Sequence, residues 1–205
     1  MAVVSNGTTL IDAGALGASA GAGKLTLIKT LTASSSSTLS FVNGASSVVF
    51  NSTYDSYIFK FINMHPATNT AYFSFQGSTN TGSSYGVTIS SAAFYNRQIE
   101  SGGNNEIDYN SSAHLNQSTS FQRLSQGVGN GGDESCSGTL EIFDPSSTTF
   151  VKHFKARMPT YQSGNYIYDQ FTSGYFNSTS AVDAIQFKFS SGNIDAGTIK
   201  LYGVG

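Results

Sequence analysis

The stretch Ile185-Gln186-Phe187-Lys188-Phe189 decides the fold class, because apolar and polar residues alternate along it without a break. Alternation with a period of two places alternate side chains on the two faces of a β-strand, whereas a helix has a period of 3.6 residues. The next residues, Ser190-Ser191-Gly192-Asn193, are typical of a turn, and residues 197–202 predict a further strand. The carboxyl end of the chain therefore indicates a β-sheet protein.

Other runs along the chain repeat this period. Residues 57–62 alternate aromatic side chains with Ile58, Lys60 and Ile62, which predicts a strand that is largely apolar on both faces. Residues 140–143 and 150–156 predict a hairpin around Asp144-Pro145-Ser146-Ser147, because proline fixes φ in such a turn. Further strands are expected at 24–32, 73–76, 165–171 and 175–176, and no run of about 12 residues has the pattern of an amphipathic helix.

The composition also favours strands. Charged residues make up 11% of the chain and aromatic residues 13%, while Ser, Thr, Gly and Asn fill the turns. We predict an all-β fold, an antiparallel β-sandwich like a jelly roll, over residues 24–205, with less than about one-tenth helix. The residues expected in its core are Phe59, Phe61, Phe75, Leu140, Ile142, Ile185, Phe187 and Ile199.

Residues 1–23 differ from the rest of the chain. They are small and apolar, rich in Gly and Ala, and include no aromatic residue and one charge, Asp12. A segment of this composition cannot bury enough surface to offset the entropy of ordering it alone. We therefore expect an extended N-terminal arm that packs on a partner through Leu10, Ile11 and Leu16.

Residues 101–132 are polar and rich in Gly and Asn, which predicts long loops at an end of the sandwich, where recognition often occurs. Gly127, Gly129 and Gly132 match the spacing of a dinucleotide-binding glycine motif. That motif requires a strand before it and a helix after it, and here a strand-like segment follows. We interpret these glycines as loop residues.

Catalysis and metal binding have little support. His65, His114 and His153 are far apart, and with a single cysteine they form no zinc-binding spacing. No serine lies in a nucleophile elbow, and the few glutamates do not indicate glycoside hydrolysis. No calcium-binding loop motif surrounds the first candidates for that ion, Asp108, Asp133, Glu134 and Asp169. We expect a non-enzymatic protein that uses no metal or cofactor.

Charge and hydropathy limit the partners. The formal net charge is −2, and the ten Lys and Arg residues form no basic run, so we expect no nucleic acid. No stretch approaches the roughly 20 apolar residues of a membrane span, and we expect no membrane partner. No positive residue precedes Lys24 to mark a signal peptide, and the single cysteine, Cys136, fits synthesis in a reducing cytoplasm.

Aromatic residues in the last third of the chain are candidates for an interface. Tyr161, Tyr166, Tyr168 and His153 lie near turns or alternate with core positions. An aromatic ring with a polar end suits either stacking on a sugar or contact between subunits. The sandwich core is the alternative place for at least half of the tyrosines. We predict a homo-oligomer in which these four residues form contacts.

Six segments point to one family: residues 9–16, 60–68, 174–177, 184–188, 190–194 and 197–203. On them, the chain resembles small β-sandwich virion structural proteins of tailed phages of marine bacteria. The resemblance implies a place in a phage particle, after synthesis in the host cytoplasm, with other virion proteins as partners. It favours a trimer over a dimer and brings no catalytic residues with it.

Two functions follow as expectations. In the first, the protein decorates or cements a capsid and holds its neighbours with the N-terminal arm. In the second, it is a tail appendage or fibre component whose end loops bind host glycans. An enzyme that acts on polysaccharide is disfavoured because paired acidic residues are scarce.

Overall fold

The computed structural model of the chain describes residues 3–5, 8–12, 15–16, 25–103 and 105–205. Within these ranges it contains fifteen strands and no helix, which confirms the predicted all-β fold. The strands are β1 (Val3–Ser5), β2 (Thr8–Asp12), β3 (Ala15–Leu16), β4 (Leu25–Thr32), β5 (Leu39–Val42), β6 (Ser56–Pro66), β7 (Ala71–Ser78), β8 (Ile89–Ile99), β9 (Glu106–Tyr109), β10 (Gln122–Val128), β11 (Cys136–Phe143), β12 (Lys152–Gln162), β13 (Tyr166–Phe176), β14 (Ala184–Phe189) and β15 (Ile194–Val204).

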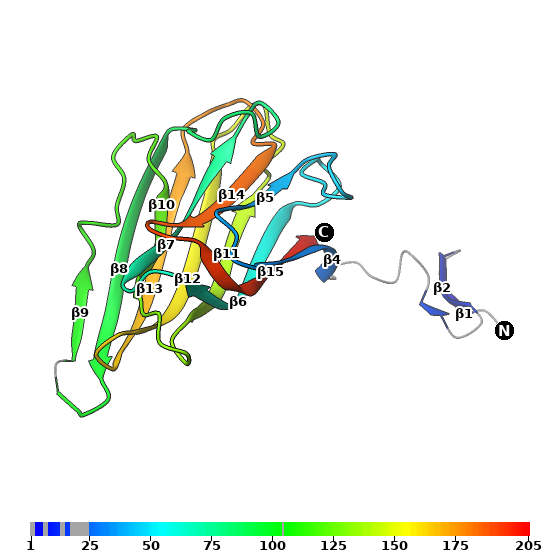
Figure 1. The fold of residues 1–205 in the computed structure, drawn as a ribbon. Helices are drawn as coiled ribbons and strands as arrows, with labels where there is room; N and C mark the ends of the chain where they lie inside the picture. Colours follow the sequence, from blue (N-terminus) through cyan, green and yellow to red (C-terminus); the bar gives the residue numbers. More distant parts are fainter. Residues whose placement is uncertain (1–2, 6–7, 13–14, 17–24, 104) are drawn as a thin grey trace.

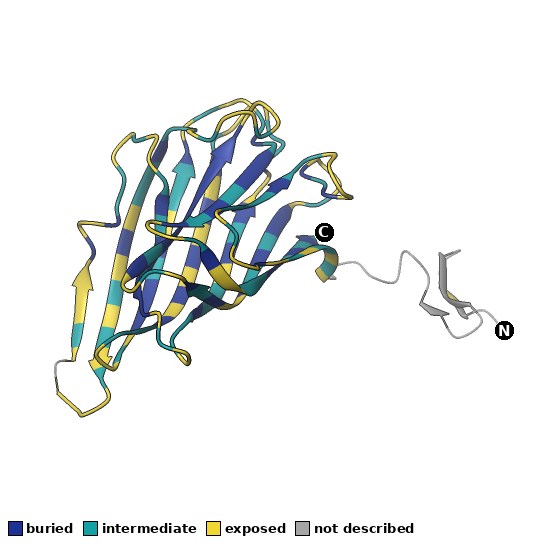
Figure 2. Cartoon of the chain, in the orientation of Figure 1, coloured by how far each residue is buried: buried dark blue, intermediate teal, exposed yellow. Residues whose placement is uncertain are grey.

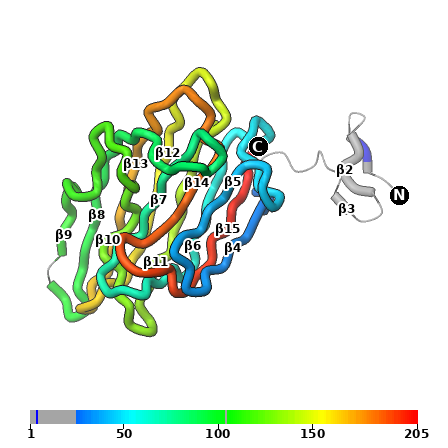
Figure 3. The backbone as a smooth tube through the Cα atoms, turned by 45° about the horizontal axis from the view of Figure 1, so that its top comes forward, coloured from blue at the N-terminus to red at the C-terminus, as the bar shows by residue number. Residues whose placement is uncertain are grey.

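Twelve of these strands form two antiparallel sheets. The larger sheet has the order β4-β15-β6-β11-β12-β13-β8-β9, and the smaller has the order β10-β7-β14-β5. The smaller sheet lies over one face of the larger (Figures 1 and 3). The fold is therefore the predicted antiparallel β-sandwich. Its strand order is compatible with a jelly roll, and that subtype stays a prediction.

Two consecutive hairpins form the centre of the larger sheet. The expected hairpin around Pro145 joins β11 to β12, and the amide of Ser147 donates to the carbonyl of Asp144 at 3.1 Å to close the turn. The next hairpin pairs β12 with β13 along their whole length. Its turn places Gly164 at φ 90° and Asn165 at φ 62°, a left-handed region that these two residue types adopt more readily than others.

The hydrophobic core lies between the two sheets (Figure 2). All eight residues predicted for the core are buried, which follows from the period of two that marked them in the sequence. Phe187 of β14 is at the centre, and its ring centroid lies 5.0–6.4 Å from those of Phe41, Phe59, Phe61, Phe73 and Phe75.

The far side of the smaller sheet is also covered. Gln76 alternates with Phe73 and Phe75, yet its side chain is fully buried. Its amide donates to the carbonyls of Thr119 and Ser120 at 3.0 and 2.9 Å, because the segment between β9 and β10 lies over this face. The sequence led us to expect long loops over residues 101–132. The structure differs in part, because this segment includes β9 and β10 and covers part of the smaller sheet.

The first three strands form a sheet of their own. β1 pairs with β2, β2 pairs with β3, and none of them belongs to either sheet of the sandwich. The sandwich begins with β4 at Leu25, next to the boundary predicted at residues 23 and 24. Binding of a partner by the arm stays a prediction, and residues 1–2, 6–7, 13–14 and 17–24 lie outside the described ranges.

Candidate functional site

The face of the larger sheet that is turned away from the smaller sheet, here called the outer face, gathers exposed apolar side chains. Ten large hydrophobic residues are exposed among those described, and the strand registers place eight of them on this face. Scattered exposed apolar residues are normal on a protein surface, whereas a concentration on one face marks a contact surface. The eight are Leu25, Leu27, Ile62, Phe94, Ile107, Tyr109, Phe143 and Ile167.

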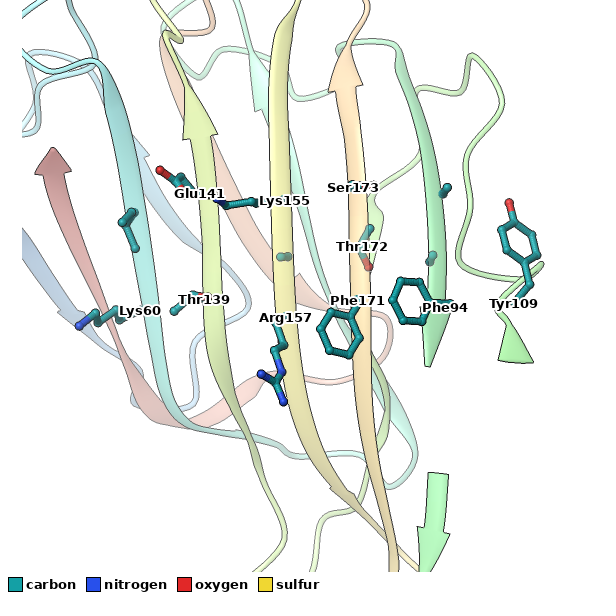
Figure 4. A pocket seen from close by; sticks show the side chains of 14 residues that line it. Lys60, Phe94, Tyr109, Thr139, Glu141, Lys155, Arg157, Phe171, Thr172 and Ser173 are labelled. Carbon is teal, nitrogen blue, oxygen red and sulfur yellow. Dashed lines mark ion pairs between the residues drawn. The ribbon is translucent and has the colours of Figure 1, made fainter. Parts of the chain in front are cut away.

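One line of residues, here called the central row, crosses the outer face at right angles to the strands. Each member is the register partner of the next, so that the pairing of the strands alone brings together residues far apart in sequence. Figure 4 shows the row from Lys60 to Tyr109, one residue on each successive strand. From β15 to β9 the row consists of Lys200, Lys60, Thr139, Arg157, Phe171, Phe94 and Tyr109.

The aromatic half of the central row is tightly stacked. The rings of Phe94 and Phe171 lie with centroids 4.8 Å apart and planes within 5° of parallel. The guanidinium carbon of Arg157 lies 5.0 Å from the centroid of Phe171, within the range of a cation–π contact. Phe94 remains about half exposed, at 48%. Arg157, Phe171 and Phe94 therefore form one ridge on the outer face.

Two ion pairs hold the polar side chains next to this ridge. Arg157 donates from Nε and Nη2 to Oδ2 of Asp169 at 2.9 and 2.7 Å, a fork that fixes both groups. These hydrogen bonds, with the charge of Asp169, raise the pKa of the Arg157 guanidinium. Lys155 Nζ lies 2.9 Å from Oε2 of Glu141, whose Oε1 accepts from the hydroxyl of Ser56 at 2.8 Å.

The cationic half of the central row has a surplus of positive charge. Lys60 and Lys200 are direct register partners on β6 and β15. Neither forms an ion pair with any residue that the structure describes. The ammonium of Lys60 lies 5.4 Å from the ring centroid of Tyr202. Since Glu141 and Asp169 are both engaged by other cations, these two lysines are left to attract an anion.

A groove of about 700 Å³ lies between the central row and the neighbouring row of register partners on this face, Ile58, Glu141, Lys155, Ser173 and Ala92, so that the ridge forms one of its walls. It extends from β6 to β9 and so crosses six strands, or about 24 Å at the usual spacing of neighbouring strands. Arg157, Phe171 and Phe94 contribute to its lining, with the small side chains of Ala92 and Ser173 beside them. Figure 4 shows Lys155 and Glu141 pointing toward one another on the neighbouring row. The groove offers charge, hydrogen bonds and apolar surface, which are the means of binding an extended ligand.

The four aromatic candidates do not form one patch. His153 and Tyr161 alternate with buried residues of β12 and lie on the outer face, while Tyr166 and Tyr168 of β13 lie on the opposite face. Tyr168 is 8% exposed and packs edge-on against Tyr95 at 5.4 Å. Their role in contacts between subunits stays a prediction, and the pleat separates them into two pairs.

The arm candidates are placed only by their strands. Leu10 and Ile11 belong to β2, and Leu16 belongs to β3. Ile11 is the register partner of both Val3 and Leu16. The side chains of these three candidates lie outside what the structure describes, so their contact with a partner also stays a prediction.

The candidate calcium ligands are dispersed. Asp169 pairs with Arg157, and Glu134 accepts a hydrogen bond from the amide of Gly131 at 2.5 Å. Asp108 is on β9, and Asp133 lies between β10 and β11. Within the described ranges, no group of three or more His, Cys, Asp or Glu side chains is arranged to hold a metal ion, and no helix has the length and apolar character needed to cross a membrane.

Comparison of the chain with protein-family models, curated proteins and solved structures finds no match. The role of the groove is therefore argued from its geometry alone. The groove could not be recognised in the sequence, because its lining comes from six separate strands that only the register of the sheet brings together. One signal was present in the sequence: Lys60 and Lys200 sit inside strongly apolar strands, at positions that must face away from the core.

Proposed function

We propose that the chain is a non-enzymatic structural protein of a phage particle, and that it decorates or cements the capsid through its N-terminal arm. The observation that supports the proposal most directly is the concentration of exposed apolar side chains on the outer face, which suits a protein that works by contact. The proposal of a phage particle rests on the resemblance of six segments to small virion structural proteins. Other virion proteins are the proposed partners, and the virion is the proposed location.

The arm is the proposed point of attachment. Among the residues that the structure describes, the strands of the arm pair only with one another, so the sandwich does not need the arm to complete a sheet. Apolar area that a partner removes from water contributes roughly 25 cal/mol per Å², less the entropy of ordering the segment. Repetition over a symmetric shell multiplies such weak contacts. A homo-oligomer, with a trimer favoured, belongs to the same proposal.

A tail appendage that binds host glycans is the second candidate. The groove favours it, because stacked aromatic rings next to fixed hydrogen-bonding groups suit a sugar chain. Both candidates leave the protein without a catalytic role. They differ in how many copies the particle holds.

Quantitative mass spectrometry of purified particles tests the proposal. A decoration protein is expected in hundreds of copies, whereas a tail appendage is expected in a handful. Particles assembled with a chain that lacks residues 1–23 are expected to lose the protein, while Phe150→Ala, a change at an exposed side chain outside the sandwich strands, serves as the matched control. Absence of the full-length chain from purified particles would end the proposal.

A further inference from the structure

We infer that the groove of the outer face binds an acidic polysaccharide chain. The inference deepens the proposed function, since it names a ligand for the surface that a particle-bound protein would present. The groove crosses six strands, so it fits a linear polymer better than a compact molecule. Its lining combines apolar and hydrogen-bonding groups. The order of aromatic, polar and cationic side chains along the central row indicates which kind of polymer the groove binds.

The aromatic half of the row suits the apolar side of a sugar ring. Phe94 is half exposed, and its ring is held in place by Phe171, which is held in turn by Arg157. A fixed ring loses little conformational entropy when a ligand packs on it. Carbon-bound hydrogens of a pyranose pack on aromatic surface as other apolar groups do. This half of the groove therefore provides apolar contact without a demand for charge.

The middle of the row suits hydroxyl groups. Arg157, Lys155 and Glu141 line the groove and are fixed by ion pairs, Arg157 with Asp169 outside the groove and Lys155 with Glu141, and Thr139 lines it next to Arg157. Arg157 uses Nε and Nη2 on Asp169, which leaves the remaining donors of the guanidinium available. Carboxylate lone pairs can accept at the same time from sugar hydroxyls. The groove thus contains both donors and acceptors in a row.

The cationic end selects acidic sugars. Lys60 lines the end of the groove, and its register partner Lys200 lies just beyond that end on β15; neither has an acidic partner among the described residues. Two like charges in direct register destabilise a sheet slightly, and an anionic group placed between them would relieve this repulsion. A carboxylate or sulfate on the polymer meets that need. The two lysines are too few for nucleic acid, whose binding depends on many phosphate contacts.

A second copy of the chain fits the face less well. Two outer faces placed together would bring their unpaired lysines into one interface, and Glu141, the acidic residue that lines the groove, is already engaged by Lys155 of its own chain. Burial of unpaired like charges opposes association. Charge complementarity therefore favours an anionic partner over self-association through this face.

Titration of the full chain with defined polysaccharides tests the inference. The probes are alginate oligosaccharides, which carry carboxylates, chondroitin sulfate, which carries both carboxylates and sulfates, and dextran, which is neutral. We expect calorimetry to show binding of at least one acidic probe that weakens as salt is added, with weaker or no binding of dextran. Failure of both acidic probes to bind at millimolar concentration, or equal affinity for dextran, would overturn the inference.

Variants locate the site. Phe94→Ala is expected to weaken binding roughly tenfold, as for an aromatic anchor, and Lys60→Gln roughly threefold with a smaller salt dependence. Phe150→Ala and Lys188→Gln are the matched controls, since Phe150 lies outside the sandwich strands and Lys188 lies on the smaller sheet over Phe121. Binding that the groove variants do not change, in chains that melt like the wild type, would place the ligand elsewhere and overturn the inference.

Two further measurements separate this inference from the proposed function. If sedimentation shows a dimer that Phe94→Ala dissociates, a second copy covers the groove and the glycan inference is overturned. If particles lose the Phe94→Ala chain, a virion protein occupies this face and the glycan inference is overturned as well. Particles that keep the variant while its glycan binding falls support both the glycan inference and the proposed structural function. Particles that hold the wild-type chain without any glycan binding leave the structural role standing and end the inference.

Discussion

Phe94 and Phe171 lie directly opposite each other on β8 and β13, and their rings stack 4.8 Å apart. This separation equals the usual distance between neighbouring strands, about 4.7–4.9 Å. The sheet itself therefore sets the spacing, and neither side chain has to bend away from its strand to make the contact. A ridge built this way is as rigid as the sheet beneath it.

The stack should couple the two residues energetically. We expect a double-mutant cycle of Phe94→Ala and Phe171→Ala to give a coupling energy of about 0.5–1.5 kcal/mol, as for other aromatic pairs. Urea denaturation of the four chains measures it. A cycle of Phe94→Ala with Phe150→Ala, whose rings form no contact pair, should be additive. Additivity in the first cycle would contradict a stabilising stack.

The centre of the core should respond very differently from the outer face. Phe187→Ala removes a fully buried ring that lies among five other phenylalanines, so we expect a loss of about 3–5 kcal/mol in the free energy of unfolding. Phe150→Ala, at a side chain that is 71% exposed, should change it by less than about 0.5 kcal/mol. A similar effect of the two changes would show that the core has been placed wrongly.

The core was predictable because a strand that buries one face has apolar and polar residues in alternation along its sequence. In β14, Ile185 and Phe187 alternate with Gln186 and Lys188, and the structure buries the first pair and leaves the second pair partly exposed. β8 gave no such signal, since its inward positions include Ser91, Tyr95 and Arg97, and it was not predicted as a strand. Pairing with β13 stabilises it along eleven residue pairs, which is a tertiary effect.

The candidate site could not be predicted for a related reason. The register of β6, β11, β12 and β13 brings Lys60, Thr139, Arg157 and Phe171 into one row, although 111 positions separate the first from the last in the sequence. A shift of one residue in any strand would move its member to the opposite face. Sequence alternation assigns a face to each residue, but it does not tell which residues become neighbours.

The single cysteine should be unreactive in the folded protein. Cys136 is 1% exposed, and burial raises the pKa of its thiol. Because the thiolate is the nucleophile, both effects slow the exchange of this thiol with a disulfide reagent. We expect Ellman's reagent to leave the native chain unmodified at neutral pH and to modify it at once in denaturant. The Cys136→Ser chain gives the background signal, and fast reaction of the native wild type would contradict the burial.

Stability should fall in alkaline solution. The hydroxyl of Tyr95 donates to Oε1 of Glu106 at 2.8 Å, and this bond, together with burial and the negative charges of Glu106 and Asp108, raises the pKa of Tyr95 to about 12. Burial also raises the pKa of Tyr57. An unfolded tyrosine loses its proton near pH 10, so above about pH 10 the unfolded chain holds fewer protons than the folded chain. The free energy of unfolding must then decrease as the pH rises from about 10 to about 12.

Urea midpoints measured at intervals from about pH 9 to about pH 11 check this slope. The Tyr95→Phe chain has no proton to lose at this position, so its stability should depend less steeply on pH, even if its overall stability is lower. An identical slope in the two chains would show that the hydrogen bond to Glu106 does not hold the proton of Tyr95.

Removal of residues 1–23 should leave the sandwich folded. β4 begins at Leu25 and pairs with β15 from Leu25↔Val204 to Thr32↔Thr198, and the three strands of the arm contribute no pairing to either sandwich sheet. We therefore expect the truncated chain to keep a β-type circular dichroism spectrum and to change its free energy of unfolding by less than about 0.5 kcal/mol. A chain truncated further, after residue 32, loses β4 and exposes a long edge of β15, so it should be much less stable and should aggregate. Unfolding of the shorter truncation would instead show that the arm belongs to the core, and its proposed role as the attachment to the particle would then fail.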